Sequence, residues 1–225
     1  MGTIIVGAGG HGRVVLDILR QAHHVDPVGF IDSNPVLRGR EVDGLTVLGS
    51  LPDIPELRRR LSIDAAIVAI GDNATRDRYA KVLSSQGLRL VNAIHPKASV
   101  ADTVRLGRNI VVAAGAVICA HCRVSDSCII NTASIVDHES FLGRAAHICP
   151  GARLAGRVIV EDLAFVGIGA TVIQCVTIGR NSTVGAGAVV LRNVEPFTTV
   201  VGVPARRLES SEDKKLAAAV EAVAS

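Results

Sequence analysis

The chain has very few aromatic residues: its 225 residues include no tryptophan, one tyrosine and four phenylalanines. Hydrophobic residues nevertheless make up 48% of the chain, so aliphatic and small side chains must fill its core. Such a composition suits thin, repeated layers better than a bulky globular core. The length allows one large domain or two small ones.

An excess of charge of one sign is also missing. The formal net charge is +3, from 24 basic and 21 acidic residues, and no basic stripe is present. We therefore expect no nucleic-acid partner. The first ten residues read neither as a signal peptide nor as a membrane span, which predicts a cytoplasmic protein without membrane attachment.

The five cysteines do not have the pattern of a disulfide framework. Their number is odd, and all lie between residues 119 and 175, which favours reduced thiols. The pair Cys119-x-x-Cys122 resembles half of a zinc site. No second pair with zinc spacing follows, so we expect no metal.

A strict six-residue repeat fills residues 93–207. Starting at Ile94, every sixth residue is Val, Ile or Leu, through to Val190, and the residue four places later is small or β-branched. This hexapeptide signature predicts a left-handed parallel β-helix in which three hexapeptides form one triangular coil of 18 residues. Glycines fall at the predicted corners, where positive φ is needed: Gly115, Gly151, Gly169 and Gly187.

The outward positions of this β-helix are unusually apolar. Residues 18 apart form three such columns: Val111, Ile129, His147 and Phe165; Val117, Ile135 and Arg153; Phe141 and Ile159. A solvated face would be polar. The pattern favours burial against identical chains around a threefold axis, that is, a homotrimer, over burial by the first domain or the C-terminal tail.

The pattern of residues 1–92 predicts a small Rossmann-like parallel sheet. Apolar runs indicate about four strands, with helices after the first and third: residues 3–6, 28–31, 65–70 and 88–91. The fold class is thus α/β plus all-β. Residues 208–225 are expected to form a C-terminal helix or tail that caps the open end of the β-helix or frays.

A glycine-rich loop follows the first predicted strand. The glycines of Gly7-x-Gly9-x-x-Gly12 let the backbone approach a ligand, and the helix that follows supplies free N–H groups to a phosphate. Asp32 lies 20 residues after Gly12, where an acidic side chain can hydrogen-bond to a ribose. The small sheet favours a nucleotide or nucleotide sugar over a dinucleotide, and a purely structural glycine turn remains the alternative.

These two parts together resemble a known family. The motifs that carry the resemblance are Gly-Ala-Gly-Gly-His-Gly (7–12), Phe30-Ile-Asp32, Ala69-Ile-Gly71-Asp-Asn73, Val136-Asp-His138-Glu139, Ala146-His147-Ile-Cys-Pro-Gly151 and Leu154-Ala-Gly156. On them the chain is identified as a member of the NeuD/PglD-type sugar acetyltransferases, over residues 3 to about 208. The resemblance implies acetyl transfer from acetyl-CoA to an amino group of a nucleotide-linked sugar.

The resemblance also implies roles for individual residues. His138 matches the general base, Glu139 the adjacent acid, and His147 a second active-site histidine. Gly156 matches the glycine whose amide faces the thioester oxygen. The nucleotide-sugar contacts are Gly10, His11, Asp32 and Asn73, with Gly9 and Gly12 completing the glycine-rich loop. Gly71-Asp-Asn replaces the Gly-Asn-Asn of some members, which leaves the identity of the sugar or base open.

The residues themselves support the same chemistry. His138 lies between Asp137 and Glu139, which can orient its imidazole and raise its basicity. Gly156, 18 residues further on, would place a bare amide one coil above the imidazole, about 5 Å away. His147 is half a coil from His138 and projects from the opposite side. The two histidines are therefore expected to meet only across an interface between chains.

Acetyl-CoA is expected to lie in the groove between the last coils of adjacent chains. Backbone access for its pantetheine amides is predicted at Gly167, Gly169, Gly185 and Ala186. Arg206 and Arg207 could reach its phosphates. The alternative for these arginines is a solvated chain exit.

Three other functions are known for, or compatible with, a β-helix of this kind. A γ-type carbonic anhydrase needs two zinc histidines five residues apart, and the chain has no such pair. A sialic-acid-type sugar O-acetyltransferase and a non-catalytic nucleotide-binding trimer remain open.

Overall fold

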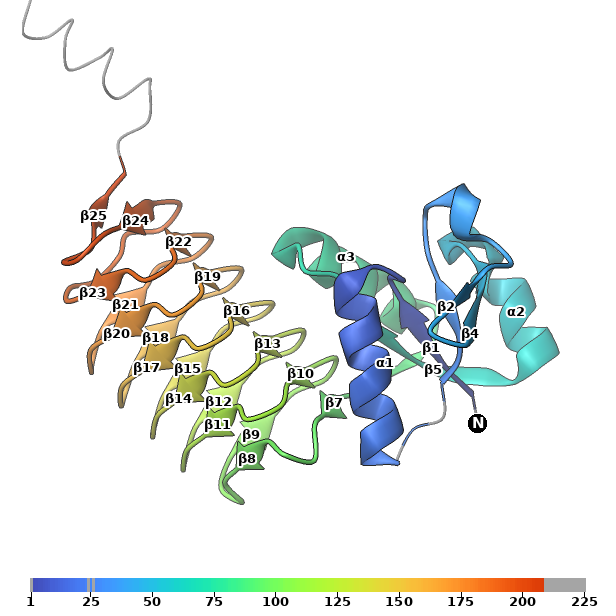
Figure 1. The fold of residues 1–225 in the computed structure, drawn as a ribbon, viewed down its shortest axis with the longest axis horizontal. Helices are drawn as coiled ribbons and strands as arrows, with labels where there is room; N and C mark the ends of the chain where they lie inside the picture. Colours follow the sequence, from blue (N-terminus) through green and yellow to red (C-terminus); the bar gives the residue numbers. More distant parts are fainter. Residues whose placement is uncertain (1, 24, 26, 209–225) are drawn as a thin grey trace, which may run out of the picture.

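The computed structural model describes residues 2–23, 25 and 27–208. An α/β unit at one end is followed by a stack of triangular coils (Figure 1). Of the predicted C-terminal segment, only Leu208 falls within the described residues. No helix in these described ranges is both long and apolar enough to span a membrane.

The α/β unit is a six-stranded sheet with helices on both faces. The strand order is β3-β4-β2-β1-β5-β6, and only β3 runs antiparallel to its neighbour. Helix α1 packs on one face, and α2 and α3 pack on the other. The elements are β1 (Gly2–Val6), α1 (Gly10–Ala22), β2 (Pro27–Ile31), η1 (Pro35–Leu37), β3 (Glu41–Val42), β4 (Leu45–Gly49), η2 (Leu51–Asp53), α2 (Ile54–Leu61), β5 (Ile63–Val68), α3 (Asn73–Ser85) and β6 (Arg89–Leu90).

The predicted Rossmann-like parallel sheet is confirmed, but the predicted number of about four strands was too low, because it lacked the β3–β4 hairpin; helix α2 was also missed. The hairpin turns at Asp43-Gly44, where both residues have positive φ, 49° and 74°. Asp-Gly between two short apolar segments is a hairpin signal. Its strands are short and partly exposed, so they lack the long apolar run on which the prediction depended.

The coils form the predicted left-handed β-helix with three parallel faces. The first sheet contains β7 (Ala93–Ile94), β10 (Val111–Val112), β13 (Ile129–Ile130), β16 (His147–Ile148), β19 (Phe165–Val166), β22 (Thr183–Val184), β24 (Thr199–Val201) and β25 (Arg206–Arg207). The second contains β8 (Ser99–Val100), β11 (Val117–Ile118), β14 (Ile135–Val136), β17 (Arg153–Leu154), β20 (Thr171–Val172) and β23 (Val189–Val190). The third contains β9 (Arg105–Leu106), β12 (Arg123–Val124), β15 (Phe141–Leu142), β18 (Ile159–Val160) and β21 (Thr177–Ile178).

The six-residue repeat sets both the core and the corners of the β-helix. The aliphatic positions and the small positions four residues later form one continuous buried core. Every sixth residue from Asn109 to Gly187 has positive φ, including the four glycines that the repeat placed at corners. Leu163 and Arg157 are among these residues, so the corner requires the left-handed conformation but not glycine.

The α/β unit packs directly against the first sheet of the β-helix. Val111 and Ile129 are fully buried in one apolar cluster with Val15, Ile18 and Leu19 of α1. The expectation that a neighbouring chain buries this part of the column was therefore wrong, because the chain's own first unit covers it. Phe141 and Ile159 of the third sheet remain exposed in the single chain.

Candidate active site

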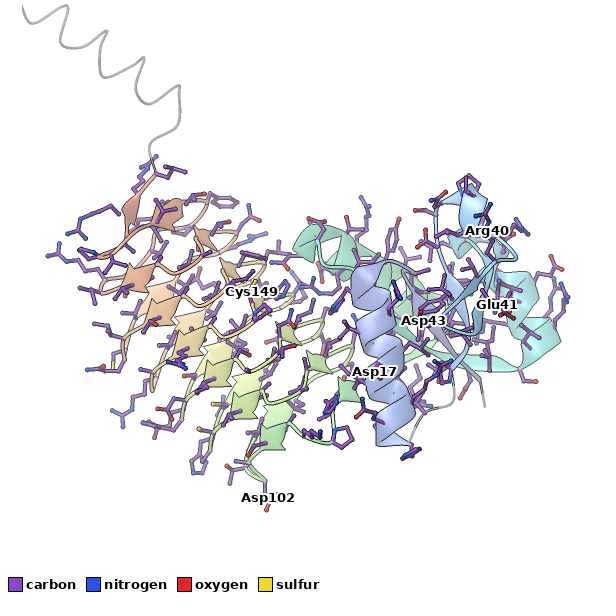
Figure 2. All side chains as sticks on the ribbon, in the orientation of Figure 1. Asp17, Arg40, Glu41, Asp43, Asp102 and Cys149 are labelled. Carbon is purple, nitrogen blue, oxygen red and sulfur yellow. The ribbon has the colours of Figure 1, made fainter. Side chains whose placement is uncertain are left out.

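The His138 ring and Gly156 lie one above the other at one edge of the β-helix. We call this edge, between the second and third sheets, the His138 corner; it comprises residues 120–121, 138–139, 156–157 and 174–175. A Cβ on Gly156 would lie 2.5 Å from Nε2 and 2.6 Å from Cε1 of His138. Glycine is therefore the residue that leaves room for the imidazole. Figure 2 labels Asp102, which begins this column of residues in the first coil.

The backbone N–H of Gly156, a buried residue, has no hydrogen-bond partner in the described ranges. Its carbonyl accepts a hydrogen bond from the Cys175 N–H at 3.1 Å. The imidazole of His138 is about half exposed, at 52% of its side-chain surface. An imidazole nitrogen and an N–H without a partner thus belong to adjacent residues of the same corner.

Glu139, rather than Asp137, faces the His138 imidazole. Oε2 of Glu139 lies 3.8 Å from Nδ1 of His138, whereas Oδ1 of Asp137 accepts the backbone N–H of His138 at 2.7 Å. Glu139 also pairs with Nε of Arg157. The hydrogen bond from Arg157, and then its charge, lower the pKa of Glu139. An ionised carboxylate therefore lies on the Nδ1 side and leaves Nε2 turned toward Gly156.

His147 lies on the first sheet, against the α/β unit of its own chain. It is only 8% exposed, packs edge-on against Phe165 with ring centroids 5.1 Å apart, and has Nε2 3.2 Å from Nδ2 of Asn131. Burial, and then the charges of Arg76 and His11, lower its pKa to about 3, against a smaller opposing effect of the Gly71 carbonyl. His147 is thus a neutral imidazole, on a different side of the coil from His138.

A cavity of about 550 Å³ opens at the carboxyl ends of β1, β2 and β5. This edge is where parallel α/β sheets bind their ligands. The predicted residues Gly9, Gly10, His11 and Asp32 line it, together with Tyr79. The structure thus brings most of the predicted nucleotide-sugar contacts together.

The glycines of the loop have two different roles. A Cβ on Gly9 or Gly10 would meet nothing within 4 Å, so the backbone at the start of α1 is open to the cavity. A Cβ on Gly12 would lie 2.0 Å from the carbonyl oxygen of Gly7. Gly12 is therefore needed for the close approach of helix and loop, and it is absent from the cavity lining.

Asp32 and His11 differ in hydrogen bonding at this cavity. The carboxylate of Asp32 accepts the N–H groups of Ala8 and Asn34, both at 2.8 Å, and so orders the loop. Nε2 of His11 is buried and has no partner among the residues that the structure describes. Burial, and then the charge of Arg76, lower its pKa to about 4.

Comparison with known proteins connects this geometry to a family. The model described as the PglD N-terminal domain matches residues 3–83, and the hexapeptide repeat of succinyl-transferase matches residues 157–192. GDP-perosamine N-acetyltransferase of Escherichia coli O157:H7 is 30% identical over 92% of this chain and 96% of its own. The chain belongs to the NeuD/PglD-type family of sugar acetyltransferases.

Solved structures of family members have the same fold along their whole length. PerB from Caulobacter crescentus, in complex with CoA and GDP-perosamine, is 41% identical, with a TM-score of 0.88 over 93% of this chain and 98% of its own. The acetyltransferase domain of PglB from Neisseria gonorrhoeae, in complex with acetyl coenzyme A, is 33% identical, with a TM-score of 0.84 over 92% and 98%. As a member of this family, the chain is an acetyltransferase.

Asn73 lies away from the cavity lining of this acetyltransferase. Its side-chain amide donates to the carbonyl oxygens of Leu163 and Ala164, at 3.0 and 3.3 Å, and accepts from Arg76 at 2.7 Å. These contacts join α3 to the β-helix. Its role in sugar binding, which the family resemblance implies, stays a prediction.

The residues predicted to hold acetyl-CoA are not all open to a ligand. A Cβ on Gly167 would lie 2.6 Å from the carbonyl oxygen of Val184, and one on Gly185 would lie 2.7 Å from Val201. The next coil therefore requires these two glycines. Gly169 and Ala186, by contrast, are exposed on the glycine corner, which comprises residues 115, 133, 151, 169 and 187 with the residue before each.

The predicted phosphate-binding arginines lie at the far end of the β-helix. Arg206 and Arg207 form the exposed strand β25 and line a hollow of about 290 Å³ together with Arg192. Three cationic side chains around one hollow suit the phosphates of CoA. The described residues include no group of three His, Cys, Asp or Glu side chains able to hold a metal ion, and the five cysteines are free.

Proposed function

We propose that the protein is an acetyl-CoA-dependent N-acetyltransferase that acts on the amino group of a nucleotide-linked sugar. The observation that carries this proposal is the packing of the His138 imidazole against Gly156, whose N–H has no hydrogen-bond partner among the described residues. The PerB complex contains both CoA and GDP-perosamine, which supports a GDP-linked amino sugar as the first substrate to test.

The His138 corner supplies both groups that acetyl transfer needs. Nε2 of His138 removes the proton as the amine attacks the thioester carbonyl, and Glu139 orients the ring from the Nδ1 side. The N–H of Gly156 donates to the oxyanion of the tetrahedral intermediate. When that intermediate collapses, the C–S bond breaks, and the proton held by His138 passes to the departing thiolate.

Open backbone and charged side chains support a binding site for each substrate. Gly9 and Gly10 leave the backbone at the start of α1 open to a phosphate, and Asp32 lies at the strand end where a ribose would be held. The bare backbone at Gly169 and Ala186 can meet the pantetheine amides, with the arginine-lined hollow beyond it.

We further infer a homotrimer in which each active site needs two chains. His147 lies on the first sheet, against which the α/β unit with its nucleotide cavity packs, whereas His138 lies at the corner between the second and third sheets. The α/β unit covers the edge between the third and first sheets. The His138 corner of a neighbouring chain can therefore approach His147 of this chain only along this chain's glycine corner.

This approach determines which sheet faces the threefold axis. The second sheet lies between the glycine corner and the His138 corner, so it turns inward when these two corners of adjacent chains meet. Its outward residues include Val117 and Ile135, both apolar and only partly buried within one chain. Burial of these two side chains against neighbouring copies explains why they are apolar rather than polar.

The test is acetyl-CoA-dependent release of free thiol with GDP-, UDP-, CMP- and TDP-linked amino sugars. We expect turnover with one of them, and a decrease of kcat by about 10²–10⁴-fold in His138→Ala. Equal turnover by His138→Ala contradicts the proposed base.

The same assay separates the remaining alternatives. Turnover of a hydroxyl acceptor such as a sialic acid, with none on amino sugars, would identify an O-acetyltransferase. Nucleotide binding without thiol release from any acceptor would identify a non-catalytic trimer.

A further inference from the structure

Helix α3 carries a cation that is completely buried between the α/β unit and the β-helix. The side chain of Arg76 is 0% exposed, and no carboxylate among the described residues forms an ion pair with it. Burying a charge is costly unless every donor finds an acceptor. Burial lowers the pKa of Arg76 to about 10, with Cys128, Asp72 and Asp77 opposing the shift, so the guanidinium stays charged at neutral pH.

Every nitrogen of the Arg76 guanidinium donates a hydrogen bond. On the α/β side, Nη1 donates to the carbonyl oxygens of Ile70 and Gly71, at 2.9 and 3.0 Å. On the β-helix side, Nε donates to Ser127 at 2.7 Å and Nη2 donates to Ala145 at 2.8 Å. Nη2 also donates to Oδ1 of Asn73. One planar group thus joins two separate units.

The acceptors on the β-helix belong to one corner of successive coils. Ser127 and Ala145 are 18 residues apart, and their positive φ values of 63° and 56° are those of the corner conformation. Further contacts extend the same line of corner residues: the Val68 N–H donates to Oδ1 of Asn109 at 2.7 Å, and Asn73 donates to Leu163 in the next coil. Arg76 is at the centre of this line.

The acceptors on the α/β side belong to the nucleotide cavity. Ile70 and Gly71 both line it. The same guanidinium therefore holds the cavity wall and two coils of the β-helix, one of which leads into the strand of His147.

We propose that Arg76 is a positioning residue that holds the nucleotide cavity in register with the coils that carry the acetyl-transfer groups. A small rotation of the α/β unit would leave the cavity intact but move the sugar amine away from the His138 corner. A misplacement of about 1 Å can lower a rate by about 10²-fold. The kinetic part of this proposal rests on the proposed function.

The test compares Arg76→Lys and Arg76→Met with Arg58→Lys. Arg58 is a matched control because it also donates to several carbonyl oxygens, those of Ile63, Gln86 and Gly87, but entirely within the α/β unit. We expect kcat to decrease by about 10-fold in Arg76→Lys and about 100-fold in Arg76→Met. The KM for acetyl-CoA should stay within about twofold of wild type.

A second measurement does not depend on activity. The amide of Val68 reports directly on the contact with Asn109, so its hydrogen exchange should be faster in Arg76→Lys than in wild type or Arg58→Lys. Wild-type kcat in Arg76→Lys, or a loss of activity that only follows the folded fraction, would overturn the proposal. If the wild type acetylates no sugar, the proposed function fails, and the exchange at Val68 alone decides whether Arg76 holds the two units together.

Discussion

Replacement of Gly156 by alanine tests the core of the proposed mechanism with a single methyl group. The new Cβ would lie 2.5 Å from Nε2 and 2.6 Å from Cε1 of His138, and 3.1 Å from Cδ2. Carbon and nitrogen atoms in contact are usually about 3.5 Å apart. The imidazole must therefore move by about 1 Å or turn away from the corner.

The expected effect is large on catalysis and small on folding. Displacing the base by about 1 Å, and covering the free N–H, should lower kcat by about 10²-fold, which corresponds to about 2.7 kcal/mol of transition-state stabilisation. Because half of the His138 side chain is exposed, the ring can rotate into solvent without disturbing the core. The midpoint of urea unfolding should therefore change little.

The assay is steady-state thiol release with saturating acetyl-CoA and amino sugar. Gly39→Ala is the control, because Gly39 lies on an exposed turn of the α/β unit, outside the proposed site, and a Cβ there would meet nothing within 4 Å. Wild-type kcat in Gly156→Ala would refute the reasoning.

Two further predictions concern assembly and pH. Ile135→Lys places a charge on the sheet that we expect to face the threefold axis, so sedimentation should show monomers without activity. The control Leu61→Lys, on the outer end of α2, should remain trimeric. A trimeric Ile135→Lys would contradict the proposal that the second sheet faces the axis. His11 and His147 have folded pKa values lowered to about 4 and about 3 from 6.5, so below about pH 6.5 the unfolded chain binds protons first. The free energy of unfolding should then decrease by up to about 1.4 kcal/mol per pH unit for each histidine as the pH falls. Urea unfolding at pH 7 and pH 5 measures this decrease. If His147→Phe loses as much stability between these pH values as wild type, His147 does not contribute.

The β-helix could be predicted in detail because its fold is local. Each coil repeats the same requirement, an aliphatic side chain and a small one four residues later, so the spacing from Ile94 to Val190 fixes the register of strands β7 to β23. The placement of Gly156 over His138 follows from that register alone. Both residues belong to successive coils at the same corner.

The contacts between the two units could not be predicted in the same way. An arginine on an amphipathic helix usually faces solvent, and no pattern in residues 73–85 shows that Arg76 meets carbonyl groups more than 50 residues away. The same absence of long-range information made the first apolar column look like an interface between chains. The local sequence gives one indication of this contact: Asn73 and Arg76 lie in the first turn of the helix that follows Gly71-Asp72 at the cavity.

Because the α/β unit packs at a fixed position on the β-helix, each coil lies at a defined distance from the nucleotide cavity. The nucleotide cavity is fixed to particular coils, and successive coils are about 4.8 Å apart. Moving the imidazole and its glycine together by 18 residues would preserve their pairing but alter the reach demanded of the acceptor by one such step. Relatives with longer or shorter sugars could thus arise by shifting a two-residue motif along an unchanged scaffold.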